Sequence, residues 1–382
     1  MKVLLVTLCS LEDNASVTLS NIGLIKGFQE LGYEVSVIAP TKNTSTNNYD
    51  NTMKLPSGIK IHYIQSNTKY ERIITNNNSK VKKMIISLLR SIYHKISIYD
   101  NTIDLVKNFK LPEKTDFFYD LVVSTSDPKT SHLYVGKLIR NGLKYSTWIQ
   151  HWGDPLSIDI SNSSIYPKWI LKIIEKKIIS IADKIIYVSP FTADAQKFLF
   201  PELSSRMLFA PLPYEEAVQY QITRHESLVF GYFGSYNSKI RNIQPLFNSF
   251  IENTEYKLVV AGNGDVNVPK IKNISIMERV SRNKIKELES ESDILICICN
   301  KSGTQIPGKL YYYAATNRPI LVILDGEYST KIRIFLEGFN RYICCENSVE
   351  SINQAIKNWS SSSIKSNPVV EFSAANVAAM LR

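Results

Sequence analysis

The sequence predicts an α/β protein with two Rossmann-like domains that face each other across a cleft. Short apolar runs alternate with amphipathic stretches along the chain, which is typical of parallel sheets joined by crossover helices. This periodicity is lost near residues 210–213, where two prolines lie, and a polar stretch follows them. A length of 382 residues also exceeds what one ordinary core supports. We therefore expect a first domain over 1–212, a linker over 213–227 and a second domain over 228–382.

The expected elements of the first domain alternate between strands and helices. An apolar strand at 2–8 precedes a helix at 17–31, whose apolar residues recur with helical spacing, and Gly32 then ends the helix. Later apolar runs predict further strands, at 34–39, 59–64, 119–125, 146–150 and 184–188.

In the second domain, apolar runs predict another series of strands, at 228–233, 257–261, 274–277, 293–299 and 319–324. The last two runs are apolar almost throughout, as expected of strands buried on both faces of a parallel sheet. Residues 309–315 between them supply a crossover helix. The polar loop 300–308 then lies at the carboxyl end of a strand, where open α/β sheets bind ligands.

Composition narrows the cellular setting and the cofactors. The five cysteines form no Cys-x-x-Cys pair and the five histidines lack ligand spacing, so we expect a reduced, cytosolic protein without zinc. The apolar start is too short for a signal peptide, and no apolar run approaches the ~20 residues of a membrane span. We therefore expect a protein that is soluble or bound peripherally to a membrane.

The net charge of +10 and the isoelectric point near 9.1 favour an anionic partner. Nucleic acid, anionic lipid and a phosphorylated substrate all meet this requirement. The basic residues are dispersed, however, and no zinc-finger, RNP or leucine-zipper pattern gathers them. We therefore expect no nucleic acid partner.

Residues 80–98 form the most amphipathic segment of the sequence. Its apolar residues fall on one helical stripe and its basic residues lie off that stripe, which suits a helix that lies in the surface of an anionic membrane. An ordinary domain helix with a solvated basic face explains the same pattern. Residues 165–181, which include Trp169 and four lysines, present the same two alternatives.

The loop that leads into Lys309 has the features of a phosphate site. Gly303 and Gly308 expose backbone, Lys309 adds a positive charge, and a helix start directs N–H groups toward an anion. A crossover connection with a solvated lysine is the alternative explanation of this segment.

The string Gln-Ile-Pro-Gly-Lys-Leu-Tyr-Tyr-Tyr-Ala-Ala-Thr-Asn-Arg-Pro-Ile-Leu at 305–321 resembles a signature of GT-B glycosyltransferases, close to the GT4-type retaining enzymes. In that family a Pro-x-Lys-Leu-x-Glu-Tyr pattern opens the helix beside the donor sugar and its diphosphate. This sequence departs from the pattern at Tyr312 and Thr304, where the family usually has acidic residues that contact the sugar and ribose. The resemblance implies donor contacts from this segment, at Thr304, Gln305, Ile306, Pro307, Gly308, Lys309 and Leu310.

A second segment, 231–242, is similar to the first loop of the family's donor domain, in which a glycine precedes a cation that holds the diphosphate. Arg241 is the first candidate for that cation and Lys239 is the second. Arg241 and Lys309 together would stabilise the negative charge of the leaving diphosphate. A solvent-exposed turn with incidental charge is the alternative. The resemblance also implies nearby donor contacts, from Gly234, Ser235, Gly262 and Val280.

The first domain places polar side chains at several expected strand ends. His151 matches the position of a family histidine near the donor sugar, so the resemblance implies that it hydrogen-bonds the sugar or the incoming hydroxyl. Packing between two tryptophans is the alternative. Ser10, Asp127, His132 and Asp154 are candidates for contacts with an acceptor sugar, while capping and turn formation explain Asp127 and Asp154 as well.

These observations and the resemblance predict a glycosyltransferase that moves a sugar from a nucleotide-diphosphate donor, UDP or GDP, to a glycan or lipid-linked glycan in bacterial surface polysaccharide synthesis. The resemblance implies retention of configuration, and we expect no metal and no cofactor besides the substrates. The catalytic candidates are His151, Arg241 and Lys309. We expect a cytoplasmic location, with an anionic inner membrane surface as a partner. A sugar-nucleotide epimerase of the same fold and a non-catalytic sugar- or nucleotide-binding protein are the alternatives.

Overall fold

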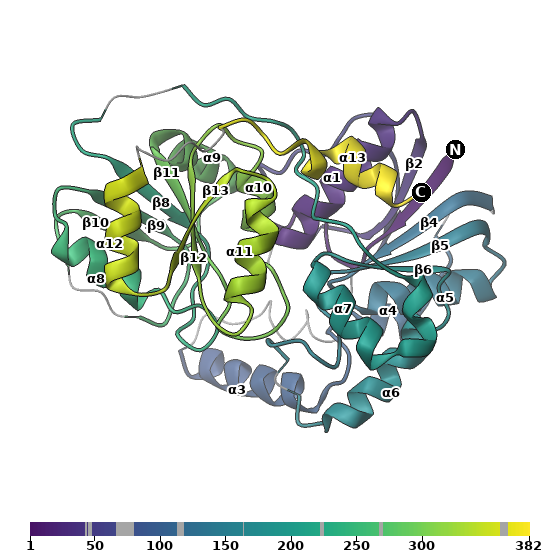
Figure 1. Cartoon of the computed structure of the whole chain (residues 1–382). Helices are drawn as coiled ribbons and strands as arrows, with labels where there is room; N and C mark the ends of the chain where they lie inside the picture. The colour runs from purple at the N-terminus through teal and green to yellow at the C-terminus, as the bar shows by residue number, and fades with distance from the viewer. Residues whose placement is uncertain are drawn as a thin grey trace. The chain divides into compact units, whose positions relative to one another are not determined.

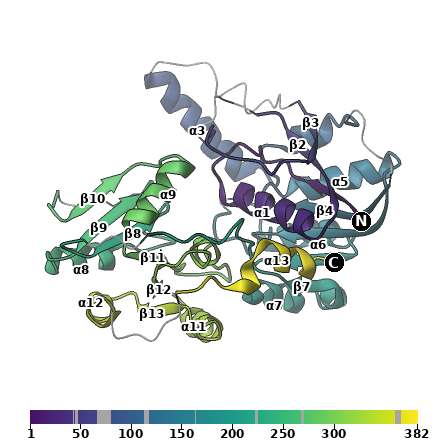
Figure 2. The ribbon, with the colours of Figure 1, turned by 90° about the horizontal axis from the view of Figure 1, so that it is seen from above.

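The computed structural model describes residues 1–42, 44, 48–65, 80–112, 118–162, 164–221, 225–266, 270–359 and 366–382. Two compact units divide the chain: unit 1 is Met1–Pro211 with Val377–Arg382, and unit 2 is Leu212–Asn376. Each unit contains one parallel sheet with helices on its faces (Figures 1 and 2). The predicted α/β architecture of two Rossmann-like domains is confirmed.

Unit 1 contains a seven-stranded sheet in the order β3-β2-β1-β4-β5-β6-β7. Its central strands are buried on both faces, which explains why they read as continuous apolar runs in the sequence. The strands are β1 (Lys2–Val6), β2 (Glu34–Pro40), β3 (Lys60–Ile64), β4 (Phe118–Thr125), β5 (Lys144–Trp152), β6 (Lys184–Tyr187) and β7 (Met207–Phe209). The short edge strand β7 was not predicted from the sequence.

Apart from the C-terminal one, which belongs to unit 1 from Val377 onward, the helices of unit 1 lie in the connections between these parallel strands. They are α1 (Ser16–Glu30), α3 (Lys80–Ile96), α4 (Ile103–Lys107), α5 (Thr130–Arg140), α6 (Lys168–Ile179), α7 (Pro190–Leu199), the 3-10 helix η1 (Pro201–Arg206) and α13 (Ala374–Met380). Local sequence sets where a helix such as α7 begins, because the Ser189 side chain accepts a hydrogen bond from the Thr192 N–H and Pro190 occupies the first turn. Within the described ranges, every helix is too short or too polar to traverse a lipid bilayer.

The C-terminal end of the chain packs in unit 1, whereas the sequence analysis assigned it to the second domain. Val377, Ala378 and Leu381 are fully buried in the same apolar cluster as Val3 of β1 and Leu24 of α1. Both ribbon views accordingly draw α13 beside α1. The apolar face of this last helix therefore completes the core of unit 1.

Unit 2 contains a six-stranded parallel sheet in the order β10-β9-β8-β11-β12-β13. Its strands are β8 (Val229–Phe233), β9 (Lys257–Ala261), β10 (Ile274–Met277), β11 (Ile294–Ile298), β12 (Ile320–Leu324) and β13 (Tyr342–Glu346), the last of which was not predicted. Its helices are α8 (Gln244–Glu252), α9 (Arg282–Glu291), α10 (Lys309–Tyr313), α11 (Ser329–Glu337), α12 (Val349–Asn358) and the 3-10 helix η3 (Val370–Phe372).

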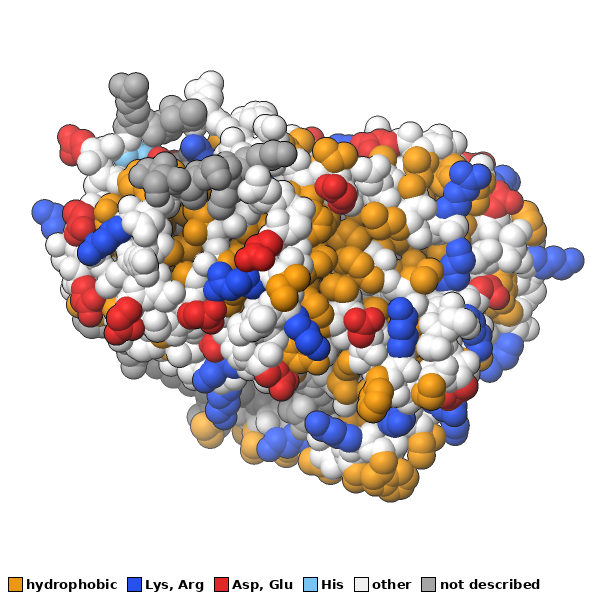
Figure 3. Space-filling view, viewed as in Figure 1, with side chains coloured by type: hydrophobic (Ala, Val, Ile, Leu, Met, Phe, Trp, Pro, Cys, Tyr) orange, Lys and Arg blue, Asp and Glu red, His pale blue; other side chains and the backbone are white. Residues whose placement is uncertain are grey.

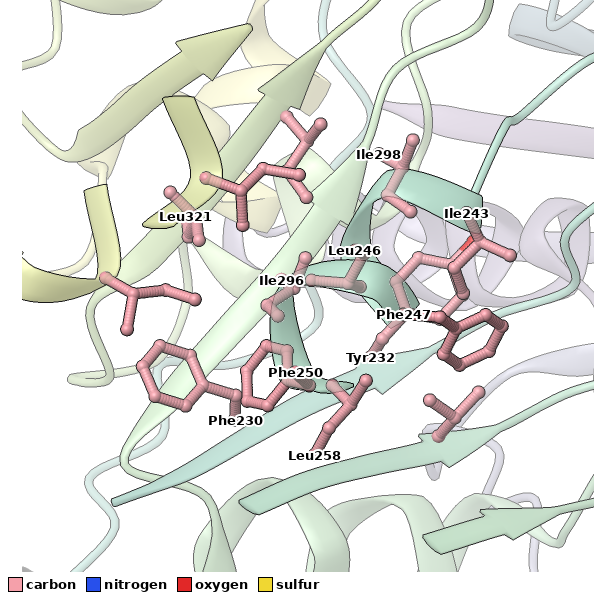
Figure 4. Close-up of a cluster of buried hydrophobic side chains, with 14 of the residues drawn as sticks. Phe230, Tyr232, Ile243, Leu246, Phe247, Phe250, Leu258, Ile296, Ile298 and Leu321 are labelled. Carbon is pink, nitrogen blue, oxygen red and sulfur yellow. The ribbon is translucent and has the colours of Figure 1, made fainter. Parts of the chain in front are cut away.

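Apolar side chains of α8 and the central strands form the core of unit 2 (Figure 4). The rings of Phe230 on β8 and Phe250 on α8 meet edge to face, with their centroids 5.3 Å apart. Leu246 and Phe247 of the same helix are also fully buried in this cluster. This packing fixes the strand ends from which the loops of the candidate site extend.

Candidate functional site

The strand order identifies one position in each sheet where loops diverge. In unit 1, β1 lies between β2 and β4, and in unit 2, β8 lies between β9 and β11. From β1 and from β8 the chain first adds two strands on one side, and it then adds all later strands on the other side. Open parallel sheets bind ligands outside the carboxyl ends of strands at such a point. The loop after β8 includes Gly234 and Arg241, and the loop after β11 leads into Lys309 at the start of α10. The loops after β1 and β4 include Ser10 and Asp127.

In unit 2, the side chain of Lys309 lies against Gly234, the residue that follows β8. A Cβ atom built on Gly234 would be 3.0 Å from the Lys309 Cε atom. The Lys309 ammonium lies over the Tyr313 ring, 5.6 Å from its centroid. Any side chain at position 234 would therefore displace the lysine, so glycine allows the cation to reach this sheet edge.

The environment of Lys309 weakens its hold on its proton. Burial lowers the pKa of Lys309 to about 8; Glu289 and Cys297 act in the opposite direction, and the positive charges of Arg282 and Arg241 lower the pKa further. Arg241 and Lys309 also both lower the raised pKa of the Cys297 thiol. These shared interactions place the two predicted cations on the same side of unit 2, within electrostatic range of each other.

Arg241 is held in place by Asn300, which lies in the loop after β11. The Arg241 Nε–H donates to Asn300 Oδ1 over 2.9 Å, and Asn300 Nδ2 donates to the Gln305 carbonyl over 3.3 Å. Asn300 is buried, so this hydrogen bond is shielded from water. The loops that follow β8 and β11 are thereby joined through side chains at the predicted anion site.

Gly262 packs directly against the backbone of the loop after β8. A Cβ atom on Gly262 would lie 2.2 Å from the Gly234 carbonyl oxygen, a distance that real structures do not allow. A Cβ atom on Gly264 would likewise lie 1.7 Å from the Tyr236 ring. Close packing against the loop after β8 therefore requires glycine at both positions, which follow β9.

Polar contacts hold the remainder of the loop after β8. Asp265 accepts hydrogen bonds from the Ser238 backbone N–H at 2.9 Å and from the Ser238 hydroxyl at 2.6 Å. On the other side, the Lys301 N–H donates to the Ile240 carbonyl over 2.8 Å. Ser235 and Lys239 are exposed on this loop. The second cation candidate is thus more solvated than Arg241, which is partly buried.

The helix after β11, α10, is shorter than predicted, and some N–H groups at its start are not free to bind an anion. The N–H groups of Leu310 and Tyr311 donate to the carbonyls of Pro307 and Gly308, over 3.0 and 3.1 Å, and so are used within the turn. A role for helix N–H groups in anion binding stays a prediction, and the side chains of Arg241 and Lys309 supply positive charge at this edge.

The other predicted donor residues differ in exposure. Val280, before α9, and Gly308 are partly buried. The Leu310 side chain is fully buried, which makes it a packing residue of the interior and leaves it no surface for a donor. Further along the loop after β11, the side chains are buried as well, at Thr304, Gln305, Ile306 and Pro307.

In unit 1, His151 lies near the carboxyl end of β5, where it is paired with Thr125 of β4 in the sheet. Only 2 % of its surface is exposed, and its Nε2 atom has no hydrogen-bond partner among the described residues. Burial lowers the pKa of His151 to about 4, because the interior disfavours the charged ring. His151 is therefore a neutral imidazole near pH 7, able to donate or accept one hydrogen bond through the unpaired nitrogen.

His132 lies within the interior of unit 1, although it was predicted to contact an acceptor. It is fully buried, its ring centroid lies 4.3 Å from that of Trp152 with the rings tilted by 32°, and its Nδ1 atom lies 2.8 Å from the Ser124 hydroxyl. Burial lowers its pKa well below the ordinary value, and His151 and Lys129 lower it further. The prediction that His132 meets an acceptor directly is corrected, because its surroundings are those of a packed histidine.

Two of the other acceptor candidates, Asp127 and Asp154, lie near Lys129. The Lys129 ammonium donates to Asp127 over 2.9 Å and to Asp159 over 3.1 Å, and Asp154 adds to the negative charge that raises the Lys129 pKa against burial. The Asp127 side chain remains 47 % exposed. Ser10 donates to Glu12 Oε2 over 2.8 Å in the loop after β1.

Sequence reasoning missed two residues that organise these edges. Asn300 was included in the polar loop after a buried strand, but nothing in the sequence indicated that it bonds Arg241, 59 positions away. No role was predicted for Lys129. A cation two residues from Asp127 was the available signal.

Comparisons with known proteins establish the fold. No protein-family model and no curated protein sequence matches the chain. Among solved structures, sucrose-phosphate synthase from Thermosynechococcus elongatus aligns over 100 % of this chain and 94 % of its own, with a TM-score of 0.55 and 10 % identity. The lipopolysaccharide outer core galactosyltransferase WaaB, in its apo form, aligns over 99 % and 97 %, with a TM-score of 0.52 and 13 % identity. S. aureus MnaA, solved with UDP, aligns over 99 % and 94 %, with a TM-score of 0.53 and 14 % identity. These similarities show that the chain has the GT-B fold.

Proposed function

We propose that this chain is a glycosyltransferase that transfers a sugar from a nucleotide-diphosphate-sugar donor to a glycan or lipid-linked glycan. The observation that carries the proposal is the convergence of Arg241 and Lys309 at the β8 and β11 edge of unit 2. Two neighbouring cations at one sheet edge favour a ligand with more than one negative charge. A diphosphate at the switch point of a parallel sheet fits that requirement.

The donor is proposed to carry UDP or GDP. MnaA, which shares this fold, was solved with UDP, and that supports a uridine nucleotide. Bond cleavage would leave negative charge on the diphosphate, and Arg241 and Lys309 would stabilise it without a metal ion. Because Arg241 is already oriented by Asn300, little reorganisation would be needed when this charge develops.

Sugar recognition is proposed to differ from that of typical GT4 enzymes. Thr304 and Tyr312 replace the usual acidic residues, so hydroxyl groups would take the place of carboxylates near the sugar. From unit 1, His151 would supply one hydrogen bond as a neutral imidazole. Retention of anomeric configuration is proposed from the family resemblance.

The acceptor is proposed to be a glycan or lipid-linked glycan of the bacterial surface. Asp127, Asp154 and Ser10 are the polar side chains proposed for its hydroxyl groups. WaaB, which shares this fold, is a lipopolysaccharide outer core galactosyltransferase, and that supports polysaccharide synthesis as the setting. The proposed location is the cytoplasm, with peripheral attachment to the inner membrane face.

Thermal unfolding with UDP, GDP, CDP and ADP tests the proposal. A nucleotide that binds the native state raises the melting temperature, and we expect UDP or GDP to do so. Arg241→Ala and Lys309→Ala should each abolish most of that rise, whereas Lys357→Ala, an exposed position on α12, should leave it unchanged. If none of the four nucleotides stabilises the protein, the transferase proposal fails.

Product analysis separates the alternatives from glycosyl transfer. An epimerase would convert a nucleotide sugar when no acceptor is present. A binding protein would be stabilised by the nucleotide sugar and would leave it unchanged with every acceptor. A transferase should release the nucleoside diphosphate faster when a suitable glycan is added.

A further inference from the structure

Helix α3 exposes the apolar stripe that an ordinary domain helix would bury. Two of these side chains, Leu89 and Ile96, also border a cavity of about 520 Å³, so no packed neighbour covers them there. The apolar residues of the stripe are 44–69 % exposed, at Met84, Ile85, Leu88, Leu89, Ile92 and Ile96. Packing within unit 1 therefore does not account for the amphipathic pattern of this helix.

Helix α6 and the residues before it have the same character. Ile165, Trp169 and Ile173 are 65 %, 64 % and 48 % exposed. The one acidic residue of the helix, Glu175, is fully buried and accepts hydrogen bonds from the N–H groups of Leu156 and Ser157. The exposed charges of the helix itself are therefore all positive, at Lys168, Lys172, Lys176 and Lys177. One of them, Lys176, is paired with Glu202 of η1 over 2.6 Å, which leaves the other three lysines for an external anion.

The two helices adjoin. The Ile165 N–H donates to the Lys95 carbonyl over 2.8 Å, which joins the last turn of α3 to the segment that enters α6. Figure 1 draws both helices along the lower edge of unit 1, and Figure 3 shows apolar and basic side chains mixed along the same edge. We call the exposed side chains of these two helices, together with Ile165, the α3–α6 surface.

The chemistry of the α3–α6 surface favours one kind of partner. The sequence of α3 contains no acidic residue, and Arg90 and Lys95 add positive charge among its apolar side chains. A second copy of this surface would bring cations against cations, so self-association is disfavoured. Apolar side chains interspersed with lysines, and an exposed tryptophan, suit the interface of a bilayer that contains anionic phospholipids.

We propose that the α3–α6 surface docks on a bilayer of anionic phospholipids, with its apolar side chains among the headgroups and its lysines on lipid phosphates. The inference rests on the proposed peripheral location and names the surface responsible. It does not depend on sugar transfer, because none of its residues belongs to the proposed donor site. Docking through two helices would hold unit 1 in one orientation on the membrane.

Co-sedimentation of the full chain with lipid vesicles tests this proposal. We expect binding to vesicles of phosphatidylcholine mixed with phosphatidylglycerol, little binding to phosphatidylcholine alone, and weaker binding as salt is raised. Leu88→Glu and Trp169→Glu, on separate helices, should each lower the partition constant by about tenfold or more. Lys172→Glu combined with Lys177→Glu should weaken binding to the anionic vesicles by a similar factor.

Two control variants match these changes at exposed positions of unit 2. Ile334→Glu on α11, where the side chain is 64 % exposed, and Lys357→Glu on α12 should bind vesicles as the wild type does. Equal binding to neutral and anionic vesicles, or equal losses in the controls, would overturn the proposal. So would a dimer, detected by light scattering, that Leu88→Glu dissociates while vesicle binding is absent.

Nucleotide stabilisation of the same variants separates the two proposals. Leu88→Glu should keep the rise in melting temperature that UDP or GDP produces in the wild type, because α3 lies in unit 1 and the proposed donor site lies in unit 2. Loss of vesicle binding with nucleotide binding intact supports the α3–α6 surface. Vesicle binding that persists in every variant rejects it, whatever the nucleotide result.

Discussion

The Nε–H of Arg241 donates to Oδ1 of Asn300 over 2.9 Å, and this hydrogen bond joins the loops that follow β8 and β11. Arginine has five N–H donors in a planar fork, so a bond at Nε fixes the plane of the guanidinium without using its terminal nitrogens. Asn300 is neutral and therefore orients Arg241 without cancelling its charge. That is the arrangement expected of a cation that awaits an anionic ligand.

Asn300→Asp should weaken binding of the nucleoside diphosphate. The change retains an oxygen that accepts from Arg241 but adds a negative charge beside the cation, which cancels much of its attraction for phosphate. We expect the dissociation constant for UDP or GDP, measured by calorimetry, to rise about tenfold or more. Asn358→Asp, at an exposed position of α12, should have no such effect. Unchanged affinity in Asn300→Asp would exclude Arg241 from the anion site.

The depressed pKa of Lys309 predicts a pH dependence of anion binding. Its pKa is about 8 in the folded chain and 10.5 ordinarily, so the ammonium loses its proton as pH rises through 8. The Cys297 thiol, whose pKa burial raises to about 11, stays protonated in this range. The dissociation constant for the nucleoside diphosphate should therefore rise between pH 7 and pH 9.5. Lys309→Arg, which keeps its charge, should flatten the profile.

The depressed pKa of Lys309 has the opposite effect on the stability of the ligand-free protein, which it makes rise with pH. Between pH 8 and 10.5 the unfolded chain binds more protons at Lys309 than the folded chain does, so this residue makes the free energy of unfolding rise with pH. Denaturant unfolding of the wild type and Lys309→Met should differ by this contribution. Parallel pH profiles for the two proteins would contradict the assigned burial of Lys309.

Gly262→Ala should destabilise unit 2 and disturb the anion site together. The added methyl would lie 2.2 Å from the Gly234 carbonyl oxygen, so the backbone must shift to accept it. We expect a loss of about 1–3 kcal/mol in the free energy of unfolding, as for other overpacked sites, along with weaker nucleotide binding. Gly136→Ala is the control, because its methyl would meet nothing closer than 3.8 Å within α5. That variant should be neutral or more stable by about 0.5–1 kcal/mol.

Local pattern was sufficient to predict most strands, because burial on both faces of a parallel sheet leaves continuous apolar runs. It failed for β13, which contains two cysteines and ends in Glu346, and whose place in the sheet depends on pairing with β12. It also failed for the C-terminal segment, whose burial against Val3 and Leu24 is a contact between opposite ends of the chain. Contacts of this range leave no local signature.

For the candidate site, the sequence indicated charge and position but not burial. Arg241 and Lys309 were identified because each follows a strand and a glycine, and the strand order then places those strands side by side. Leu310 was assigned to the donor from the family resemblance and His132 to an acceptor from its place after a strand, yet both are fully buried. Whether a residue in a motif faces outward depends on packing by other elements, which sequence spacing does not specify.

Lys129→Met should destabilise unit 1 strongly, since it would leave carboxylates without their partner. The side chains of Lys129 and Asp159 are 12 % and 7 % exposed, so their charges are poorly solvated. We expect a loss of about 3–5 kcal/mol in the free energy of unfolding, measured with urea. A loss below about 1 kcal/mol would show that the ion pair is no more than a surface contact.

The variant Asp127→Asn tests whether Asp127 contacts the acceptor, independently of its ion pair with Lys129. Because the Asp127 side chain is 47 % exposed, its removal should change the free energy of unfolding by less than about 1 kcal/mol. If Asp127 binds an acceptor hydroxyl, kcat/KM for the acceptor should fall while nucleotide stabilisation is unchanged. Equal kcat/KM in the two proteins would remove Asp127 from the acceptor site.

His151 should make unit 1 sensitive to acid. Its pKa is about 4 in the folded chain and 6.5 ordinarily, so the unfolded chain binds more protons between these values and stability falls as the pH is lowered from 6.5 toward 4. The full shift corresponds to about 3 kcal/mol. His151→Gln cannot take up this proton, so its free energy of unfolding should vary less with pH than that of the wild type. If His151→Gln loses stability in acid as steeply as the wild type, the histidine is already solvated and charged in the folded chain, and its proposed role as a neutral hydrogen-bonding group is wrong.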